Sequence, residues 1–70
     1  MPVITSPMAG TVSRVLVQAG DTVQLGQDVV ILESMKMEIA VQAEASGKVK
    51  GVRVGDGEFV DEGSILLDLE

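Results

Sequence analysis

An internal repeat limits the folds open to this chain more than any other feature of its sequence. Residues 10–33 align with residues 47–70 without a gap, at a shift of 37 positions. The identical pairs are mainly turn glycines and valines: Gly10, Val12, Val15, Val17, Gly20, Val23, Gly26, Leu32 and Glu33, which align with Gly47, Val49, Val52, Val54, Gly57, Val60, Gly63, Leu69 and Glu70. The repeat predicts that both halves follow the same four-strand path and are related by a pseudo-two-fold axis.

Short strands separated by turns account for both copies. Residues 11–17 and 48–54 are rich in valine and carry polar side chains at the positions that would face water. Glycine-containing breaks such as Gly20-Asp21 and Gly57-Glu58 separate these segments, and no segment has an apolar stripe of helical period. We therefore expect one all-β domain over residues 1–70, with about eight short strands in two antiparallel sheets.

The predicted core lies between these sheets and follows the repeated apolar positions. Met8 should fill a gap in it, and Phe59, the only aromatic residue, should close one edge of the interior. The predicted core residues are Val12, Val15, Val17, Val23, Val30, Leu32, Val49, Val52, Val54, Val60, Leu67 and Leu69.

The stretch between the two copies is unlike the rest of the chain. Residues 33–38 read Glu-Ser-Met-Lys-Met-Glu and lie between the apolar runs 29–32 and 39–41. These runs predict two strands, which places Met35 and Lys36 at the tip of a β-hairpin. A two-residue hairpin turn normally uses Asn-Gly or a similar pair, because its central residues need positive φ. Met-Lys is therefore a poor choice for a turn that only has to fold.

The residues that flank this turn are also unfavourable for folding. If Ser34 pairs with Met37, then Glu33 faces Glu38, and like charges directly opposite each other in a sheet are destabilising. Residues that break a local rule are often functional. The exposed amine of Lys36 is therefore the first candidate for a functional group.

Composition argues against several classes of function. The chain has no cysteine and no histidine, so it lacks the commonest general base and the usual metal ligands, and we expect neither catalysis nor a metal site. Eleven acidic against five basic residues give a net charge of −6, which disfavours nucleic acid and anionic membranes and favours a basic protein partner. Residues 1–7 contain no basic, apolar signal sequence, which predicts a cytoplasmic protein.

Residues 33–38, with Ser-Pro-Met-Ala-Gly at 6–10 and Ser-Gly-Lys-Val at 46–49, resemble the biotinyl domain of biotin carboxyl carrier proteins and biotin-dependent carboxylases. The likeness covers nearly the whole chain, although many members have alanine in place of Ser34. It implies a flattened barrel-sandwich hybrid of two four-stranded antiparallel sheets. Some bacterial carriers contain an inserted thumb, and the gapless repeat leaves no room for one, so the chain is more similar to thumbless carriers.

The resemblance implies that Lys36 accepts biotin from a biotin protein ligase. The tethered biotin would then carry a carboxyl group from a biotin carboxylase to a carboxyltransferase. The chain would be a non-catalytic carrier and a monomer in isolation. Met35, Met37, Glu33 and Glu38 would form the surface that the ligase recognises, and at least one methionine should also cover the end of the sandwich.

The sequence is also compatible with other interpretations. A lipoyl carrier of a 2-oxoacid dehydrogenase complex has the same fold, although lipoyl domains usually flank their lysine with an acidic and a small residue rather than with two methionines. A structural sandwich module, as in membrane-fusion adaptors, would leave Met-Lys-Met unexplained. The glutamates could be merely solubilising charges. The chain could be a freestanding carrier or part of a longer protein, and the carboxyl acceptor is undefined.

Overall fold

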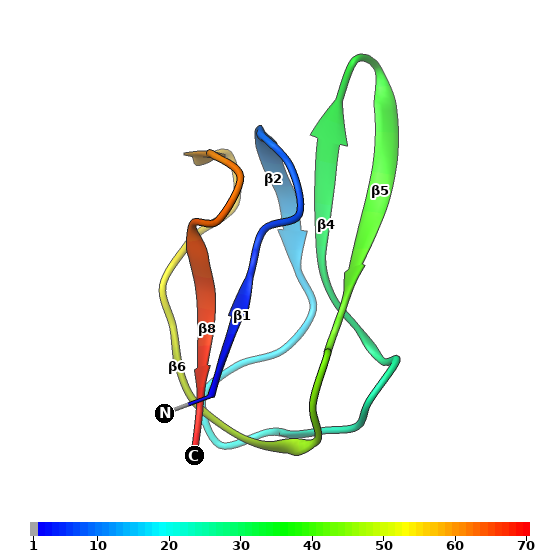
Figure 1. The fold of residues 1–70 in the computed structure, drawn as a ribbon. Helices are drawn as coiled ribbons and strands as arrows, with labels where there is room; N and C mark the ends of the chain where they lie inside the picture. Colours follow the sequence, from blue (N-terminus) through cyan, green and yellow to red (C-terminus); the bar gives the residue numbers. More distant parts are fainter. Residues whose placement is uncertain (1) are drawn as a thin grey trace.

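The computed structural model describes residues 2–70, which contain eight β-strands and no helix (Figure 1). The strands are β1 (Val3–Thr5), β2 (Gly10–Val15), β3 (Thr22–Val23), β4 (Asp28–Ser34), β5 (Met37–Gln42), β6 (Gly47–Val52), β7 (Phe59–Val60) and β8 (Ile65–Leu69). The valine-rich segments supply β2 and β6, as expected. The prediction of an all-β chain is confirmed.

The strands form two four-stranded antiparallel sheets with equivalent strand orders. One sheet has the order β1-β8-β6-β3 and the other β5-β4-β2-β7. A shift of 37 residues exchanges β1 with β5, β2 with β6, β3 with β7 and β4 with β8, and so converts one order into the other. Each sheet therefore combines strands from both halves, and the predicted pseudo-two-fold relation is confirmed.

The equivalence extends to the register and to its irregularities. Ile4 pairs with Leu67 in one sheet, and the equivalent residues Val41 and Val30 pair in the other. The β2–β4 register shifts between Val12 and Arg14, and the β6–β8 register shifts between the equivalent positions 49 and 51. A bulge changes the direction of a strand and strengthens its twist, so the two sheets curve in the same manner.

Backbone hydrogen bonds connect each half to the other at equivalent turns. Gly20 has φ of +97° and its N–H donates to the carbonyl of Val49 at 2.9 Å. Gly57 has φ of +87° and its N–H donates to the carbonyl of Val12 at 2.7 Å. Glycine suits both positions because it adopts positive φ without steric cost. The halves are thus interlocked and not merely stacked.

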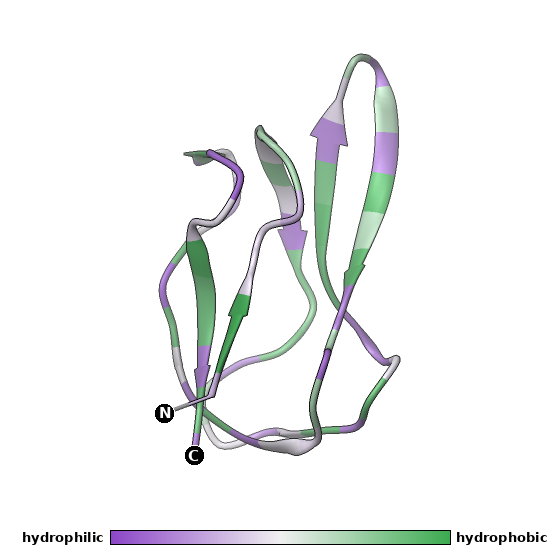
Figure 2. Cartoon of the chain, viewed as in Figure 1, coloured by the Kyte–Doolittle hydropathy of each residue, from purple (hydrophilic) through white to green (hydrophobic). Residues whose placement is uncertain are grey.

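The core lies between the sheets and contains most of the predicted residues. β5 is apolar from residue 39 to residue 41, and β8 is apolar over most of its length (Figure 2). Val15, Val17, Val52 and Val54 are only partly buried and pack against the core with Met8, the predicted gap filler. The fully or nearly fully buried apolar residues are Ile4, Val12, Val23, Val29, Val30, Leu32, Val41, Ala43, Val49, Val60, Leu66, Leu67 and Leu69.

Two neighbouring pairs in this core break the alternation on which the prediction relied. Val29 and Val30 are both buried, as are Leu66 and Leu67. In the first pair the cause is a register shift between Asp28 and Val30, because a bulge leaves two consecutive residues opposite one residue of the partner strand. Strict period-2 reasoning therefore missed Val29 and Leu66.

The prediction that Phe59 closes the interior is wrong. Its side chain is 64% exposed, whereas its neighbour Val60 is 4% exposed. Successive side chains of a strand point to opposite faces. Val60, which pairs with Gly10, takes the inward position of the two-residue strand β7, so Phe59 must point outward.

The molecule is elongated, with extents of 32 × 19 × 17 Å. The β4–β5 hairpin projects beyond the other strands at one end, and both chain ends lie close together at the opposite end (Figure 1). Any group on the hairpin tip is therefore far from the point where the chain begins and ends.

Candidate functional site

The hairpin between β4 and β5 holds all the residues that the sequence singled out. Ser34 pairs with Met37, and Glu33 pairs with Glu38. The predicted register is confirmed, and the two-residue turn consists of Met35 and Lys36. The antiparallel ladder below this turn continues to Asp28, paired with Gln42, and gives the tip a stiff base.

Both turn residues have left-handed backbone conformations. Met35 has φ of +53° and Lys36 has φ of +65°, and these are the non-glycine residues with positive φ in the described part of the chain. Such a conformation suits the twist of a hairpin, but it costs an L-residue roughly 1–2 kcal/mol. The β4–β5 ladder stabilises this geometry, which presents two consecutive side chains at the end of the hairpin.

The side chains at the tip are open to solvent. Lys36 is exposed, Met35 is 92% exposed and Met37 is 64% exposed. The expectation that one of these methionines covers the end of the sandwich is wrong, since neither packs against the core. Leu32 is the last buried residue of β4, and beyond it the hairpin projects past the other strands (Figure 1).

Glu33 and Glu38 lie on the outer face of the sheet just below the tip. Thr11 of β2 pairs with both Glu33 and Phe59, and directly paired residues lie on the same face of a sheet. Phe59, Thr11, Glu33 and Glu38 therefore form a row across four strands. Sequence reasoning missed Phe59 as a surface residue near the lysine, because it assigned that side chain to the core.

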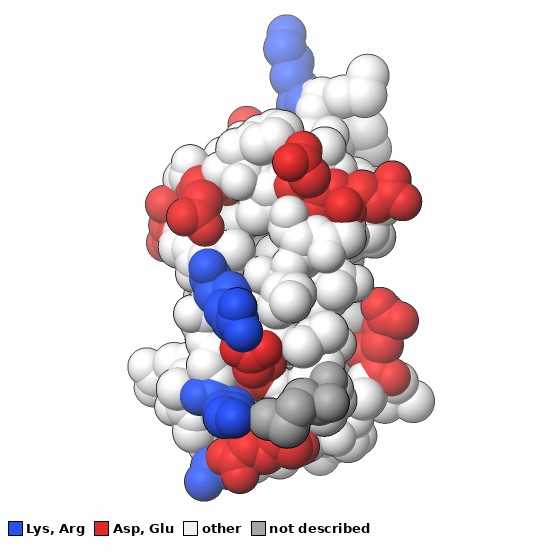
Figure 3. All heavy atoms as spheres, turned by 60° about the vertical axis from the view of Figure 1, so that its left-hand side comes forward, with Lys and Arg blue, Asp and Glu red and all other residues white. Residues whose placement is uncertain are grey.

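The chain has two other lysines, and both belong to a different environment. Lys48 and Lys50 lie on β6, in the sheet that does not contain the hairpin. Both are exposed, and on the face shown in Figure 3 acidic groups lie among the cationic side chains of the lower half. Only Lys36 combines an exposed amine with a projecting turn.

The chemistry available at the tip is that of a primary amine. An amine on a flexible four-carbon stem can form an amide with an activated carboxyl group that another protein presents. In residues 2–70 no group of three or more acidic side chains is placed to hold a metal ion. Over the same residues no helix is long and apolar enough to cross a membrane.

Comparison with known proteins gives a consistent family. The family model described as "Biotin-requiring enzyme" matches residues 2–69. A biotin/lipoyl attachment protein of Bacillus subtilis is 52% identical over 66 residues, which cover 94% of this chain and 90% of that protein. The biotin carboxyl carrier protein of acetyl-CoA carboxylase from Solanum lycopersicum is 43% identical over 67 residues, with 96% of each chain covered.

Larger proteins contain a similar region. Pyruvate carboxylase of Bacillus subtilis is 46% identical over 67 residues, which are 96% of this chain and 6% of that enzyme. The crystal structure of Kluyveromyces lactis urea carboxylase superposes with a TM-score of 0.90 at 30% identity, over 99% of this chain and 6% of that one. The chain thus corresponds to a small part of these multidomain carboxylases and to nearly the whole of the small attachment and carrier proteins. It belongs to the biotin/lipoyl attachment family of biotin-requiring enzymes.

Proposed function

We propose that this chain is a biotin carboxyl carrier and that the Nζ atom of Lys36 is the point of biotin attachment. The observation that carries this proposal is the position of Lys36, which is exposed in a left-handed turn at the end of the one hairpin that projects beyond the sandwich. The names of the relatives, a biotin carboxyl carrier protein and several carboxylases, support biotin as the attached group.

Attachment needs an external enzyme. A lysine amine is protonated at neutral pH and is then not a nucleophile, and the chain has no histidine to accept the proton. A biotin protein ligase would therefore supply both the base and biotinyl-adenylate. The Lys36 nitrogen forms an amide bond with the carboxyl carbon of biotin, AMP leaves, and the ammonium protons are lost to the ligase and to solvent.

Recognition by the ligase would depend on the surroundings of the lysine. Met35 and Met37 present flexible apolar side chains that can adapt to a partner surface. Glu33 and Glu38 add negative charge just below the tip, which would orient a basic ligase surface. The left-handed turn holds Lys36 clear of the sheet, so the ligase active site can enclose the amine without contacting the core.

The fold is suited to carrying a cofactor between two active sites. When bound, biotin accepts a carboxyl group at a biotin carboxylase and gives it to an acceptor at a carboxyltransferase. Attachment to a small rigid domain replaces diffusion of free biotin by a high effective concentration at both sites. The tip and the chain ends lie at opposite ends of the molecule (Figure 1), so a linker at either chain end would leave the biotinyl group unobstructed.

Intact mass after co-expression with a biotin ligase tests the proposal. We expect the wild-type chain to gain the mass of one biotin and Lys36→Arg to gain none. Lys50→Arg is the matched control, since it removes another exposed lysine and should still gain one biotin. Biotin on the Lys36→Arg variant would contradict the assignment.

A lipoyl carrier is the second candidate, because one close relative is described as a biotin/lipoyl attachment protein. The same mass measurement separates the two cofactors when the chain is exposed to both ligases. Gain of a lipoyl group alone would replace the biotin proposal. The methionines on both sides of Lys36 favour biotin.

The role of Met37 can be tested separately from its contribution to stability. Because this side chain is 64% exposed and lies off the core, Met37→Ala should change the free energy of unfolding by less than about 0.5 kcal/mol. We expect the rate of biotinylation by the ligase to fall severalfold in the same variant. An unchanged rate would exclude Met37 from the recognised surface.

A further inference from the structure

A small hollow lies on the outer face of the hairpin sheet, close to the proposed biotin site. Its volume is about 240 Å³ and it is lined by Ser13, Arg14, Ile31 and Glu38. The bulge in β2 creates it, because the register shift between positions 12 and 14 places Ser13 and Arg14 side by side on the outer face. Glu38 contributes from β5, two residues beyond Lys36.

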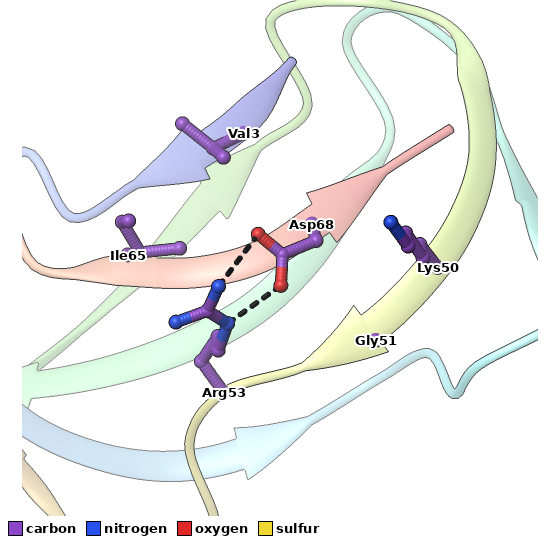
Figure 4. A pocket seen from close by; sticks show the side chains of 6 residues that line it. All are labelled: Val3, Lys50, Gly51, Arg53, Ile65 and Asp68. Atoms are coloured by element: carbon purple, nitrogen blue, oxygen red, sulfur yellow. Dashed lines mark hydrogen bonds and ion pairs between the residues drawn. The ribbon is translucent and has the colours of Figure 1, made fainter. Parts of the chain in front are cut away.

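The equivalent bulge of the other half also has a hollow, but there the charges are already paired. That hollow is lined by Val3, Lys50, Gly51, Arg53, Ile65 and Asp68 (Figure 4). Arg53 Nε donates to Asp68 Oδ2 at 2.5 Å, and its Nη2 donates to Oδ1 at 3.3 Å. In this bidentate pair each charge is balanced by its partner, which weakens the attraction of either group for a further charged or polar ligand.

In the hairpin sheet, the charged groups of the hollow lack such partners. Ile31 occupies the position equivalent to Asp68, and within residues 2–70 Arg14 forms no ion pair. The one hydrogen bond of the Glu38 carboxylate in that range comes from Ser13 Oγ at 3.5 Å, the outer limit for a hydrogen bond. A cation, a carboxylate and an apolar side chain thus converge on the same small space.

We propose that this hollow is a docking site for the bicyclic head of the biotin attached to Lys36. The proposal rests on the proposed function, since it requires biotin on that lysine. The ureido group has two N–H donors and one carbonyl acceptor. The two N–H groups point away from each other on either side of the carbonyl, so the Glu38 carboxylate can accept from one of them, the Arg14 guanidinium can donate to the carbonyl, and Ile31 can contact the thioether ring.

The distances along the hairpin allow this contact. Glu38 lies two residues from Lys36 and Ala40, the partner of Ile31, lies four residues away, so the hollow begins about 7 Å and ends about 13 Å down the strand. The lysine stem and the biotin side chain together give an arm of about ten single bonds near 1.5 Å each, which spans on the order of 12 Å when extended. The other hollow lies in the opposite sheet and is not adjacent to the hairpin.

The docked state is expected to be partly populated and readily released. Hydrogen bonds to exposed charged groups are weak in water, but a short tether supplies an effective concentration in the millimolar range. A site with millimolar affinity would therefore hold the head for roughly half of the time. Such a site restricts the arm between transfers and still lets it enter a partner enzyme.

Chemical attachment of biotin tests the proposal independently of any ligase. The chain has no cysteine, so Lys36→Cys can be labelled at one position with a thiol-reactive biotin and compared by amide NMR with the same protein carrying an alkyl group. We expect label-dependent shifts at Ser13, Arg14, Ile31 and Glu38. Shifts confined to residues 34–38, with none at positions 13, 14 and 31, would overturn the proposal.

Two variants of the labelled protein complete the test. Arg14→Ala should abolish the shifts at Ser13 and Ile31 and raise the rate of capture by streptavidin about twofold, since half-docked biotin is hidden half of the time. Lys50→Ala, in the equivalent hollow, is the matched control and should change neither the amide shifts at Ser13 and Ile31 nor the capture rate. Equal capture rates for all three proteins would contradict docking. Because the label is attached chemically, this outcome does not depend on whether a ligase accepts Lys36.

Discussion

The two halves of this molecule have the same backbone design, and the hairpin that joins them does not follow it. Each half has a bulge at an equivalent position, after Val12 in β2 and after Val49 in β6. Each also has positive-φ glycines at equivalent turns. In the first half β4 leads through Ser34 into the Met35-Lys36 turn, which lies between the aligned segments 10–33 and 47–70. The two halves thus build one rigid sandwich together, and the proposed functional group lies on the segment that joins them.

A second difference lies on the outer faces of the sheets. Leu16 and Ile31 of the first half correspond to Arg53 and Asp68 of the second, so one half has apolar residues where the other has an ion pair. At these outer positions the two halves therefore differ in charge, whereas equivalent core positions such as Leu32 and Leu69 are apolar in both halves. The core requires both halves to obey the same packing rules, while the outer faces are free to acquire separate roles.

The largest expected effect tests whether the cores of the two halves are energetically equivalent. Leu32 and Leu69 occupy equivalent, fully buried positions. Because each truncation leaves a cavity, Leu32→Ala and Leu69→Ala should each lower the free energy of unfolding by about 2–5 kcal/mol, as measured by urea denaturation. Leu25→Ala, at a 69% exposed loop position, is the control and should have little effect. Costs that differ by more than about 2 kcal/mol between the two core variants would mean that the repeat does not extend to packing.

A smaller effect should distinguish the halves at their first glycines. A Cβ atom at position 10 would lie 2.9 Å from the Glu33 carbonyl oxygen, whereas at position 47 the nearest atom would be 3.6 Å away. We expect Gly10→Ala to lower the free energy of unfolding by about 1–3 kcal/mol, because the backbone near Glu33 must move. Gly47→Ala should lower it by less. Thermal unfolding of both variants under one condition measures the difference. A larger loss for Gly47→Ala would show that the close approach at Gly10 is relieved easily.

The hairpin turn should become more stable when it is made more like the other turns. The other residues with positive φ are glycines, at positions 20, 26, 57 and 63, whereas in the hairpin Met35 and Lys36 adopt this conformation. Replacing these two residues by Asn and Gly should raise the free energy of unfolding by about 1–2 kcal/mol and remove the proposed acceptor amine. Lys36→Arg is the control, with an unchanged turn conformation and unchanged stability. No gain in the Asn-Gly variant would show that the turn is not strained.

The sequence was sufficient for the features that depend on the repeat and on chain order. Repeated glycines and valines predicted two equivalent sheets, and the two apolar runs around residues 33–38 predicted the hairpin, its register and its exposed lysine. Burial of Val29 and Leu66 was not predictable from period 2, because bulges place consecutive residues on one face. Phe59 was misplaced because β7 has only two residues, and a shift of one position reverses the face.

The outer hollows were also beyond the reach of sequence reasoning, because they depend on how bulged strands bring Arg14 to Glu38 and Arg53 to Asp68. The last pair gives the smallest expected effect. Its side chains are 57% and 19% exposed, so Arg53→Ala should cost about 0.2–1 kcal/mol. The cost should shrink in 1 M salt, where screening acts over about 3 Å.

Leu16→Ala is the matched comparison for this ion pair, since Leu16 occupies the equivalent outer position and carries no charge. Its cost, measured by urea denaturation, should not fall with added salt, because it reflects lost apolar contact. If both variants respond to salt alike, the Arg53–Asp68 contact contributes nothing through charge. The two outer faces would then differ in composition but not in what stabilises them.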